Sequence, residues 1–263
     1  MFRTALFGSR MLSASMLVAS ILAASAATLF AASNTVSVPS TADIWLAGQP
    51  NTTVLQGVYA SFDVAPANSP VLASTGLNLT AGSYLTFAAS GVTSYSTCTG
   101  ASPDGGGGCG TYTTASYFGI STYRGPVNSL VGVFVNSNVP GGTAPSGLDF
   151  TTSGSQSQST ISPALNQVLF IGDGVTGTGS GSVQHFVVPA GATRLVLGSA
   201  DGAGANYDNP ANLAFSVTIS DAPTAAPGVS TAVSTPAVSA IVLIAMALLL
   251  MGSGAYYLKG RAT

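Results

Sequence analysis

The sequence predicts an all-β fold, an antiparallel β-sandwich, for the long middle part of the chain. Short runs of β-branched and aromatic residues recur there between clusters of Gly, Pro, Asn and Ser. No part of the middle has the apolar period of a capped helix. Glu is absent and the only Lys is Lys259, although helix surfaces normally use both residue types. An apolar segment at each end adds a predicted signal helix and a predicted transmembrane helix.

Residues 1–33 are predicted to be a signal peptide. Arg3 and Arg10 precede an apolar run that is rich in small residues. Cleavage motifs of the A-x-A kind occur at 24–26 and, less clearly, at 31–33. The alternative is an uncleaved N-terminal anchor, because the apolar run is long for a signal peptide.

The other end of the chain is predicted to cross a membrane. Segment 237–258 is apolar and uncharged, and it has about the ~20 residues needed to span a bilayer. Lys259 and Arg261 follow it, so the positive-inside tendency places 259–263 in the cytoplasm and the body of the chain outside. Segment 222–236 is rich in Pro, Ala, Thr and Ser, which predicts an extended stalk before the membrane.

The exported part, 34–221, is acidic and long enough to bury a core. It holds all eight acidic residues of the chain, every one an Asp, and its only basic residues are Arg124 and Arg194. Without a patch of Lys and Arg it has nothing to neutralise a phosphate backbone, so nucleic-acid binding is excluded.

Eight segments have the composition of strands. The clearest is 213–219, where apolar residues alternate with small or polar ones and predict one face on a core. The predicted strands are 53–60, 77–79, 84–89, 130–135, 167–171, 185–188, 194–197 and 213–219. Segment 141–162 is rich in Gly, Ser, Thr and Gln and is expected to be a surface insertion.

Cys98 and Cys109 lie in one Gly-rich loop and are the only cysteines. In an exported protein such a pair is expected to form a local disulfide. On the loop-entropy model it would contribute about 2–3 kcal/mol. A metal site is the alternative. Two cysteines would need further ligands, but the sequence has no second cysteine pair and its single His is distant.

No pattern in the sequence nominates an enzyme active site, so a non-enzymatic protein is expected. His185 lies in a strand-like run, and neither G-x-S-x-G nor H-E-x-x-H occurs. Segment 172–177 matches G-x-G-x-x-G, but the following Thr-Gly-Ser-Gly-Ser cannot begin the helix that a dinucleotide site needs. A loop or hairpin is expected there. A hydrolase, the remaining alternative, would have to use His185 or Asp104.

An oxygen-rich turn follows the predicted strand 194–197. Asp201, Asn206, Asp208 and Asn209 lie within nine positions, among glycines. Ca²⁺ binds roughly six to eight oxygens with carboxylates among them, so this turn is a candidate calcium site, although its spacing is not that of an EF-hand. The alternative is that Asn and Asp simply favour turns.

Three strings resemble the calcium-dependent galactophilic lectins, a galactose-binding-like family with a small β-sandwich fold. Segment 77–91, followed by Ser94-Tyr95 and Pro103-Asp104-Gly105, is similar to the opening half of that fold. Segments 188–198 and 215–219, on either side of the turn, are similar to its closing half, and 128–133 is similar to the strand between. No His or Gln follows Gly105, where the galactose lectins use these residues on sugar hydroxyls.

The resemblance implies a Ca²⁺ to which sugar hydroxyls coordinate. The implied metal ligands are the side chains of Asp201, Asp208 and Asn209 and the main-chain oxygens of Tyr95 and Ala205. The residues expected to contact a ligand are Tyr95, Asp104 and Tyr207. For Asp104 the alternative is a structural role in a tight Pro-Asp-Gly turn.

The C-terminal layout resembles exosortase-sorted surface proteins of Gram-negative bacteria, of the PEP-CTERM and IPTL-CTERM type. A Pro-containing motif at 234–239, an apolar span and a short basic end occupy the corresponding places. The resemblance implies an exosortase-type sorting protease and display at the cell surface, in contact with exopolysaccharide. A plain membrane anchor is one alternative. The other is a structural surface or matrix protein that has no ligand, or that uses Ca²⁺ only for stability.

Overall fold

A computed structural model describes most of the predicted exported part of the chain. The described residues are 31–57, 62–95, 98–106 and 108–222. Nearly all of the predicted signal peptide, and the predicted stalk, transmembrane helix and basic tail beyond 222, lie outside these residues. Among the residues that are described, no helix is long and apolar enough to cross a membrane.

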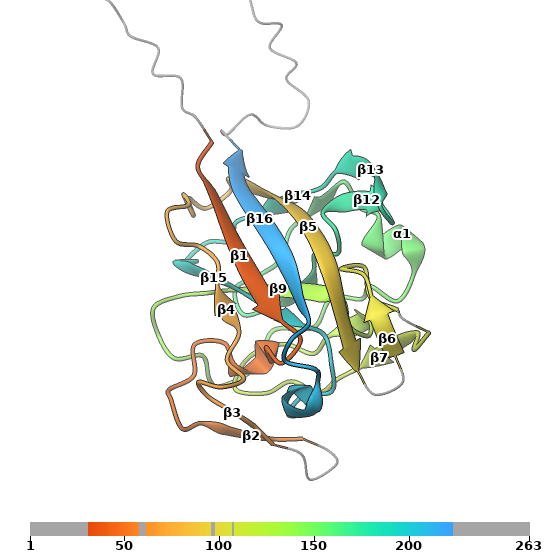
Figure 1. The fold of residues 1–263 in the computed structure, drawn as a ribbon. Coiled ribbons are helices and arrows are strands. Elements are labelled where there is room, and N and C mark those ends of the chain that lie inside the picture. Colours follow the sequence, from red (N-terminus) through yellow and green to blue (C-terminus); the bar gives the residue numbers. More distant parts are fainter. Residues whose placement is uncertain (1–30, 58–61, 96–97, 107, 223–263) are drawn as a thin grey trace, which may run out of the picture. The chain divides into compact units, whose positions relative to one another are not determined.

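The fold is all-β, as predicted, and its larger sheet runs in the order β1-β16-β5-β14-β10, with β6 also paired to β5 (Figure 1). Its strands are β1 (Ser33–Pro39), β5 (Tyr84–Tyr95), β6 (Cys98–Ala101), β10 (Thr160–Ile161), β14 (His185–Val187) and β16 (Ala214–Ala222). The pairings are antiparallel except that of β10 with β14, which is parallel.

The second sheet has the order β11-β9-β15-β4 and is antiparallel. Its strands are β4 (Val71–Leu72), β9 (Leu130–Val135), β11 (Val168–Phe170) and β15 (Arg194–Ser199). Three further strand pairs are β2 (Val54–Gln56) with β3 (Phe62–Val64), β7 (Thr111–Thr113) with β8 (Arg124–Pro126), and β12 (Val175–Gly177) with β13 (Ser180–Val183). The described helices are single turns: η1 (Ile44–Leu46), α1 (Ser153–Gln156) and η2 (Asn206–Asp208).

One apolar core takes side chains from both larger sheets. On β16, Phe215, Val217 and Ile219 are fully buried and the residues between them are more exposed, so the alternation predicted for this strand is confirmed. Every residue of β9 is buried, and Trp45 of η1 lies in the same core. Each fully buried large apolar side chain contributes about 1.5–3 kcal/mol, which makes this core the main stabilising feature.

The predicted strand 77–79 is wrong. The Asn78 side chain accepts hydrogen bonds from the main-chain and side-chain groups of Thr80, and the Asn78 N–H donates to Asp221 Oδ2 (2.8 Å). These local bonds turn the chain and compete with a sheet ladder. Leu77 and Leu79 still pack against the core, which explains the strand-like pattern.

The sequence analysis missed β1, because its first residue falls at the end of the predicted signal segment. β1 pairs along its whole length with β16, from Ser33 opposite Ser220 to Pro39 opposite Ala214. The alternation of Val36 and Val38 with Thr and Ser is the pattern that identifies it. The glycine-rich segment 172–177 leads into the β12–β13 hairpin, as expected.

Candidate functional site

The oxygen-rich turn follows β15 and is fixed to the fold at its first residue. Ala200 N–H donates to Ser129 O (2.9 Å), and Asn128 N–H donates to Ala200 O (2.7 Å). The turn then runs through η2 and returns to β16. The start of the turn, Ala200, is therefore held against the 128–129 segment beside β9.

Asp201 and Asn209 are in direct contact and almost fully buried, with 2 % and 4 % of their surfaces exposed. Asn209 Nδ2 donates to Asp201 Oδ2 (2.9 Å) and to Ser40 O (3.0 Å). Asp201 Oδ1 accepts from the Gly202 N–H (2.6 Å). Burial raises the pKa of Asp201 to about 7, against the lowering effect of these hydrogen bonds, because a buried carboxylate loses its hydration.

The other residues of the predicted metal set lie on or beside η2. Ala205 precedes this turn of 3₁₀ helix, and its N–H donates to Gly202 O (2.8 Å). Asp208, the last residue of η2, is exposed, and Tyr207 beside it is 50 % exposed. The charge of Asp208 is close enough to raise the pKa of Asp201. The structure thus brings Asp201, Asp208 and Asn209 into one neighbourhood.

Tyr95 ends β5, at the same end of the fold as the turn. Two residues earlier, Thr93 Oγ1 donates to Asn128 O (3.0 Å), and the same Asn128 holds Ala200. Tyr95 itself pairs with Cys98 on β6. The segments that the lectin resemblance joins are therefore both attached to Asn128, although they are about a hundred positions apart in sequence.

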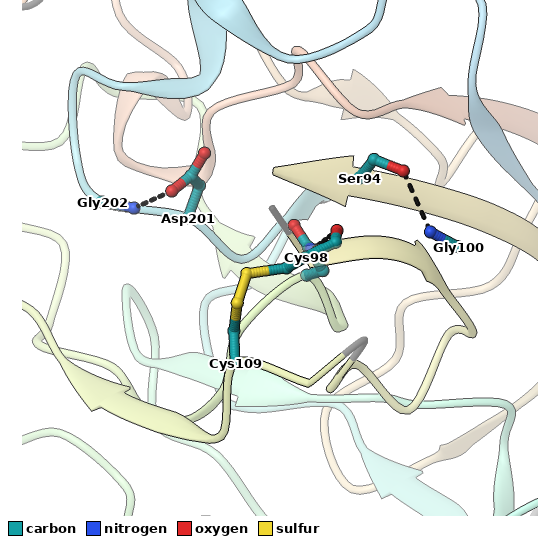
Figure 2. The surroundings of a disulfide bond; sticks show 7 residues. Ser94, Cys98, Gly100, Cys109, Asp201 and Gly202 are labelled. Carbon is teal, nitrogen blue, oxygen red and sulfur yellow. Dashed lines mark hydrogen bonds between the residues drawn. A yellow bond between two sulfur atoms is a disulfide. The ribbon is translucent and has the colours of Figure 1, made fainter. Parts of the chain in front are cut away.

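The predicted disulfide between Cys98 and Cys109 is present, with 5.6 Å between the Cα atoms. Asp201 and Gly202 lie in its surroundings (Figure 2). Asn128 Nδ2 donates to Cys98 O (3.0 Å), which connects the disulfide loop to the same buried asparagine. The cross-link thus fixes the loop that borders the oxygen-rich turn.

Two buried aspartates beneath the turn escaped the sequence analysis. Asp43 Oδ2 accepts from the Gly204 N–H and Asp63 Oδ2 accepts from the Asn206 N–H, each at 2.9 Å. Burial, and then the neighbouring carboxyl of Asp63, raise the pKa of Asp43 well above its usual range; burial also raises the pKa of Asp63. Of the two, only Asp43 could have been identified from its local sequence. It is the N-cap of η1, where its side chain accepts a hydrogen bond from the Trp45 N–H.

No basic side chain of the described residues neutralises these buried carboxylates. Arg124 pairs with Asp149 (3.0 Å), and Arg194 donates to the main-chain oxygens of Asn136 and Asn138. A buried carboxylate without a cation either keeps its proton or binds a cation from solution. The turn therefore lies over acidic groups that no basic side chain of the described residues balances.

The donor chemistry of the turn fits Ca²⁺ in part. Asn209 Oδ1 is buried and has no hydrogen-bond partner in the described part of the chain, and an amide oxygen is a normal Ca²⁺ ligand. Within that same part, no three acidic, His or Cys side chains gather in a metal-binding group. A Ca²⁺ at this turn would consequently take many of its oxygens from amides and the main chain.

Asp104 belongs to a tight turn and also to a cleft. The Gly105 N–H donates to Ser102 O (2.8 Å), so the turn reading of Pro-Asp-Gly is confirmed. The Asp104 carboxylate leaves this turn and accepts from the Asp173 N–H (3.1 Å). Burial, opposed by that hydrogen bond, raises the pKa of Asp104 to about 6.

His185 lies at the start of β14, where its ring packs edge-on against Tyr84 with 5.7 Å between centroids. This contact packs the ring against the neighbouring strand β5. Comparisons of the chain with protein-family models, with curated proteins and with solved structures find no match. The lectin and sorting resemblances therefore remain predictions from the residues that carry them.

Proposed function

We propose that this chain is an exported, non-enzymatic surface protein whose two larger sheets form a galactose-binding-like β-sandwich and whose 201–209 turn binds carbohydrate with the help of Ca²⁺. In this proposal the C-terminal segment 237–258 anchors the chain in the membrane or serves an exosortase-type protease as a sorting signal. The partner is exopolysaccharide at the surface of a Gram-negative-type bacterium.

One observation carries the site: the Asp201 carboxyl group is buried, has no basic side chain of the described residues beside it, and belongs to a turn that also holds exposed Asp208. A divalent cation would remove the cost of burying that charge. Asp201, Asp208 and the Asn209 side-chain oxygen would hold it, with main-chain oxygens such as those of Ala205 and Tyr95 completing its shell. The bound ion would supply positive charge and open coordination positions that attract vicinal hydroxyls.

Tyr207 gives the turn a surface for a sugar ring. Its side chain is half exposed and directly precedes Asp208, so its flat apolar face and its hydroxyl are available next to the acidic group. The disulfide supports the export part of the proposal, since such cross-links persist in oxidising compartments.

The test is a Ca²⁺ titration of the full chain by calorimetry, followed by a glycan array in Ca²⁺ and in EDTA. We expect micromolar to millimolar Ca²⁺ binding and glycan signals that EDTA removes. Asp208→Asn should weaken both. Asp149→Asn is the matched control, because Asp149 is another exposed aspartate and lies outside the turn. Absence of Ca²⁺ binding would refute the proposed site.

A structural role is the second candidate, and the burial of Asp201 and Asn209 favours it. Two side chains that are almost fully buried and bonded to each other can stabilise a turn without any ligand. A Ca²⁺-dependent rise in melting temperature with no glycan signal would select a surface or matrix protein that uses Ca²⁺ only for stability.

A further inference from the structure

A polar cleft lies away from the oxygen-rich turn, between α1 and the β12–β13 hairpin, which neighbour each other in Figure 1. It has a volume of about 150 Å³. The lining groups that carry the argument are Asp104, Ser153, Ser157, Phe170, Thr176 and Thr178. Ligand pockets for drug-sized molecules are larger, roughly 300–1,000 Å³, so this cleft suits a single small ring.

The lining selects a neutral, hydroxyl-rich ligand. Four hydroxyl side chains can each donate and accept hydrogen bonds, a carboxylate accepts them, and one aromatic ring supplies an apolar patch. Among the described residues, no Lys, Arg or His lines the cleft, which disfavours phosphates and other anions. The apolar part of the lining is small, which disfavours a lipid chain. A saccharide ring combines many hydroxyls with apolar C–H faces and fits this description.

The walls of the cleft are fixed by hydrogen bonds. Gln184, which is fully buried, donates through Nε2 to Gln156 O (2.8 Å) and Gln158 O (2.7 Å), so it ties α1 to the sheet. On the other wall, Asp173 accepts from the N–H groups of Val175 (3.0 Å) and Gly179 (2.6 Å) and so shapes the hairpin. Preformed walls reduce the entropy lost when a ligand binds.

Asp104 connects the cleft to the rest of the domain. Its Oδ1 accepts from the Asp173 N–H, whereas its Oδ2 is buried and has no hydrogen-bond partner among the described residues. An unsatisfied buried carboxylate oxygen is costly, so rotation of the Asp104 side chain toward a hydroxyl donor in the cleft would be favoured. Burial raises the pKa of Asp104 to about 6, because a buried carboxylate loses its hydration.

We infer that this cleft is a calcium-independent carbohydrate subsite, in which Asp104 and the hydroxyls of Thr176 and Thr178 bind one neutral sugar ring. The inference takes its ligand class from the proposed function but does not depend on the 201–209 turn. Ser153 and Ser157 come from segment 141–162, which the sequence predicts to be a surface insertion and which lies outside the strings that carry the lectin resemblance. The subsite is therefore a feature of this chain rather than of the resemblance.

The experiment measures binding of neutral monosaccharides (glucose, galactose, mannose and rhamnose) to the full chain in EDTA by saturation-transfer NMR. The chain is kept in a detergent without a sugar headgroup. We expect at least one monosaccharide to bind. Thr178→Val, which removes one exposed hydroxyl, and Asp104→Asn should each weaken its binding about 2- to 10-fold. Thr193→Val is the matched control, an exposed threonine outside the cleft, and should change nothing.

The outcomes separate this inference from the proposed function. No binding of the four sugars in EDTA, or equal binding by wild type, Thr178→Val and Asp104→Asn, would overturn the subsite. Asp208→Asn should leave binding in EDTA unchanged, because it alters only the turn. If glycan signals need Ca²⁺ and survive Thr178→Val, the turn binds sugar and the cleft does not. If signals persist in EDTA and in Asp208→Asn but fall in Thr178→Val, the cleft binds sugar and the turn does not.

Discussion

Asn209 Nδ2 donates a hydrogen bond of 2.9 Å to Asp201 Oδ2, and both side chains are almost fully buried at the start and the end of one turn. The same Nδ2 donates to Ser40 O, next to β1. A single amide group thus joins the turn to the first strand region and partly satisfies a buried carboxylate. The turn has a structural function whether or not it binds a ligand.

We predict that Asn209→Ala lowers the free energy of unfolding by about 2 to 3 kcal/mol. The substitution removes two buried hydrogen bonds and leaves the Asp201 carboxylate with an unmet acceptor, which costs more than the loss of an exposed bond. Urea unfolding of the full chain in EDTA measures this loss in the free energy of unfolding. Asn138→Ala is the control, because Asn138 is exposed, and it should change stability by less than about 0.5 kcal/mol.

The buried aspartates predict an unusual dependence of stability on pH. Burial raises the pKa of Asp43 and of Asp63, and it raises the pKa of Asp201 to about 7. In the unfolded chain these groups titrate near a pKa of about 3.9. The folded state therefore binds more protons between about pH 4 and pH 7, so stability is highest at the acid end and falls as the pH rises. Asp149, whose pKa is lowered by bonds from Thr151, acts in the opposite sense but is exposed to solvent.

Melting temperatures in EDTA at pH 4.5 and pH 7.5 test this prediction. Asp43→Asn should flatten the profile, since an amide stays neutral at both pH values; it should also lower stability overall, because its NH2 group cannot accept a hydrogen bond as Asp43 Oδ2 does from the Gly204 N–H. A melting temperature that rises steadily from pH 4.5 to pH 7.5 in EDTA would contradict the prediction. If Ca²⁺ binds at the turn, it should raise the melting temperature more at pH 7.5 than at pH 4.5, because protons compete with it for Asp201.

Loss of the disulfide should destabilise the domain without abolishing its fold. The bridge joins residues 11 positions apart, and on the loop-entropy model a loop of this length is worth about 2–3 kcal/mol. Replacing both cysteines by serine should reduce the free energy of unfolding by that amount, measured in urea. Wild type treated with a reducing agent is the control and should match the double variant. Equal stability of oxidised and reduced protein would contradict the loop-entropy contribution of the bridge.

The parts of the fold that the sequence predicted are those where local pattern and burial agree. The segment 130–135 became β9 with the same limits, because its apolar run is enclosed on both faces. The pattern of 213–219 likewise identified most of β16. The strand predicted at 77–79 is wrong because the Asn78 side chain accepts hydrogen bonds from Thr80. A pattern of apolar residues cannot reveal such local bonds.

The candidate site was predictable only where its residues are close in sequence. The composition of 201–209 singled out Asp201 and Asn209, and the structure places them in contact. Asp43 and Asp63 contact the same turn but lie more than a hundred positions from it in the sequence. Residue spacing therefore could not identify them as part of the site. The cleft beside Asp104 was missed for the same reason, since its walls come from segments around 104, 153–157 and 175–178.

Gly172 offers the sharpest test of how the chain is packed around Asp104. It has a positive φ of 61°, and a Cβ placed on it would lie 2.5 Å from Asp104 Oδ1 and 2.8 Å from the Phe170 ring. Gly142 has a similar φ of 70° with nothing within 4 Å of such a Cβ. Both glycines adopt a left-handed backbone conformation, but a side chain would clash with its neighbours only at Gly172.

Alanine at either position should cost about 1–2 kcal/mol for the left-handed backbone. Gly172→Ala should lose about a further 1–3 kcal/mol, because the Asp104 carboxylate or the Phe170 ring must move to admit the methyl group. Urea unfolding of the two variants side by side isolates this difference. If both variants lose the same free energy of unfolding, the wall of the cleft moves at no cost. Asp104 would then not be held in the position that the proposed ligand contact requires.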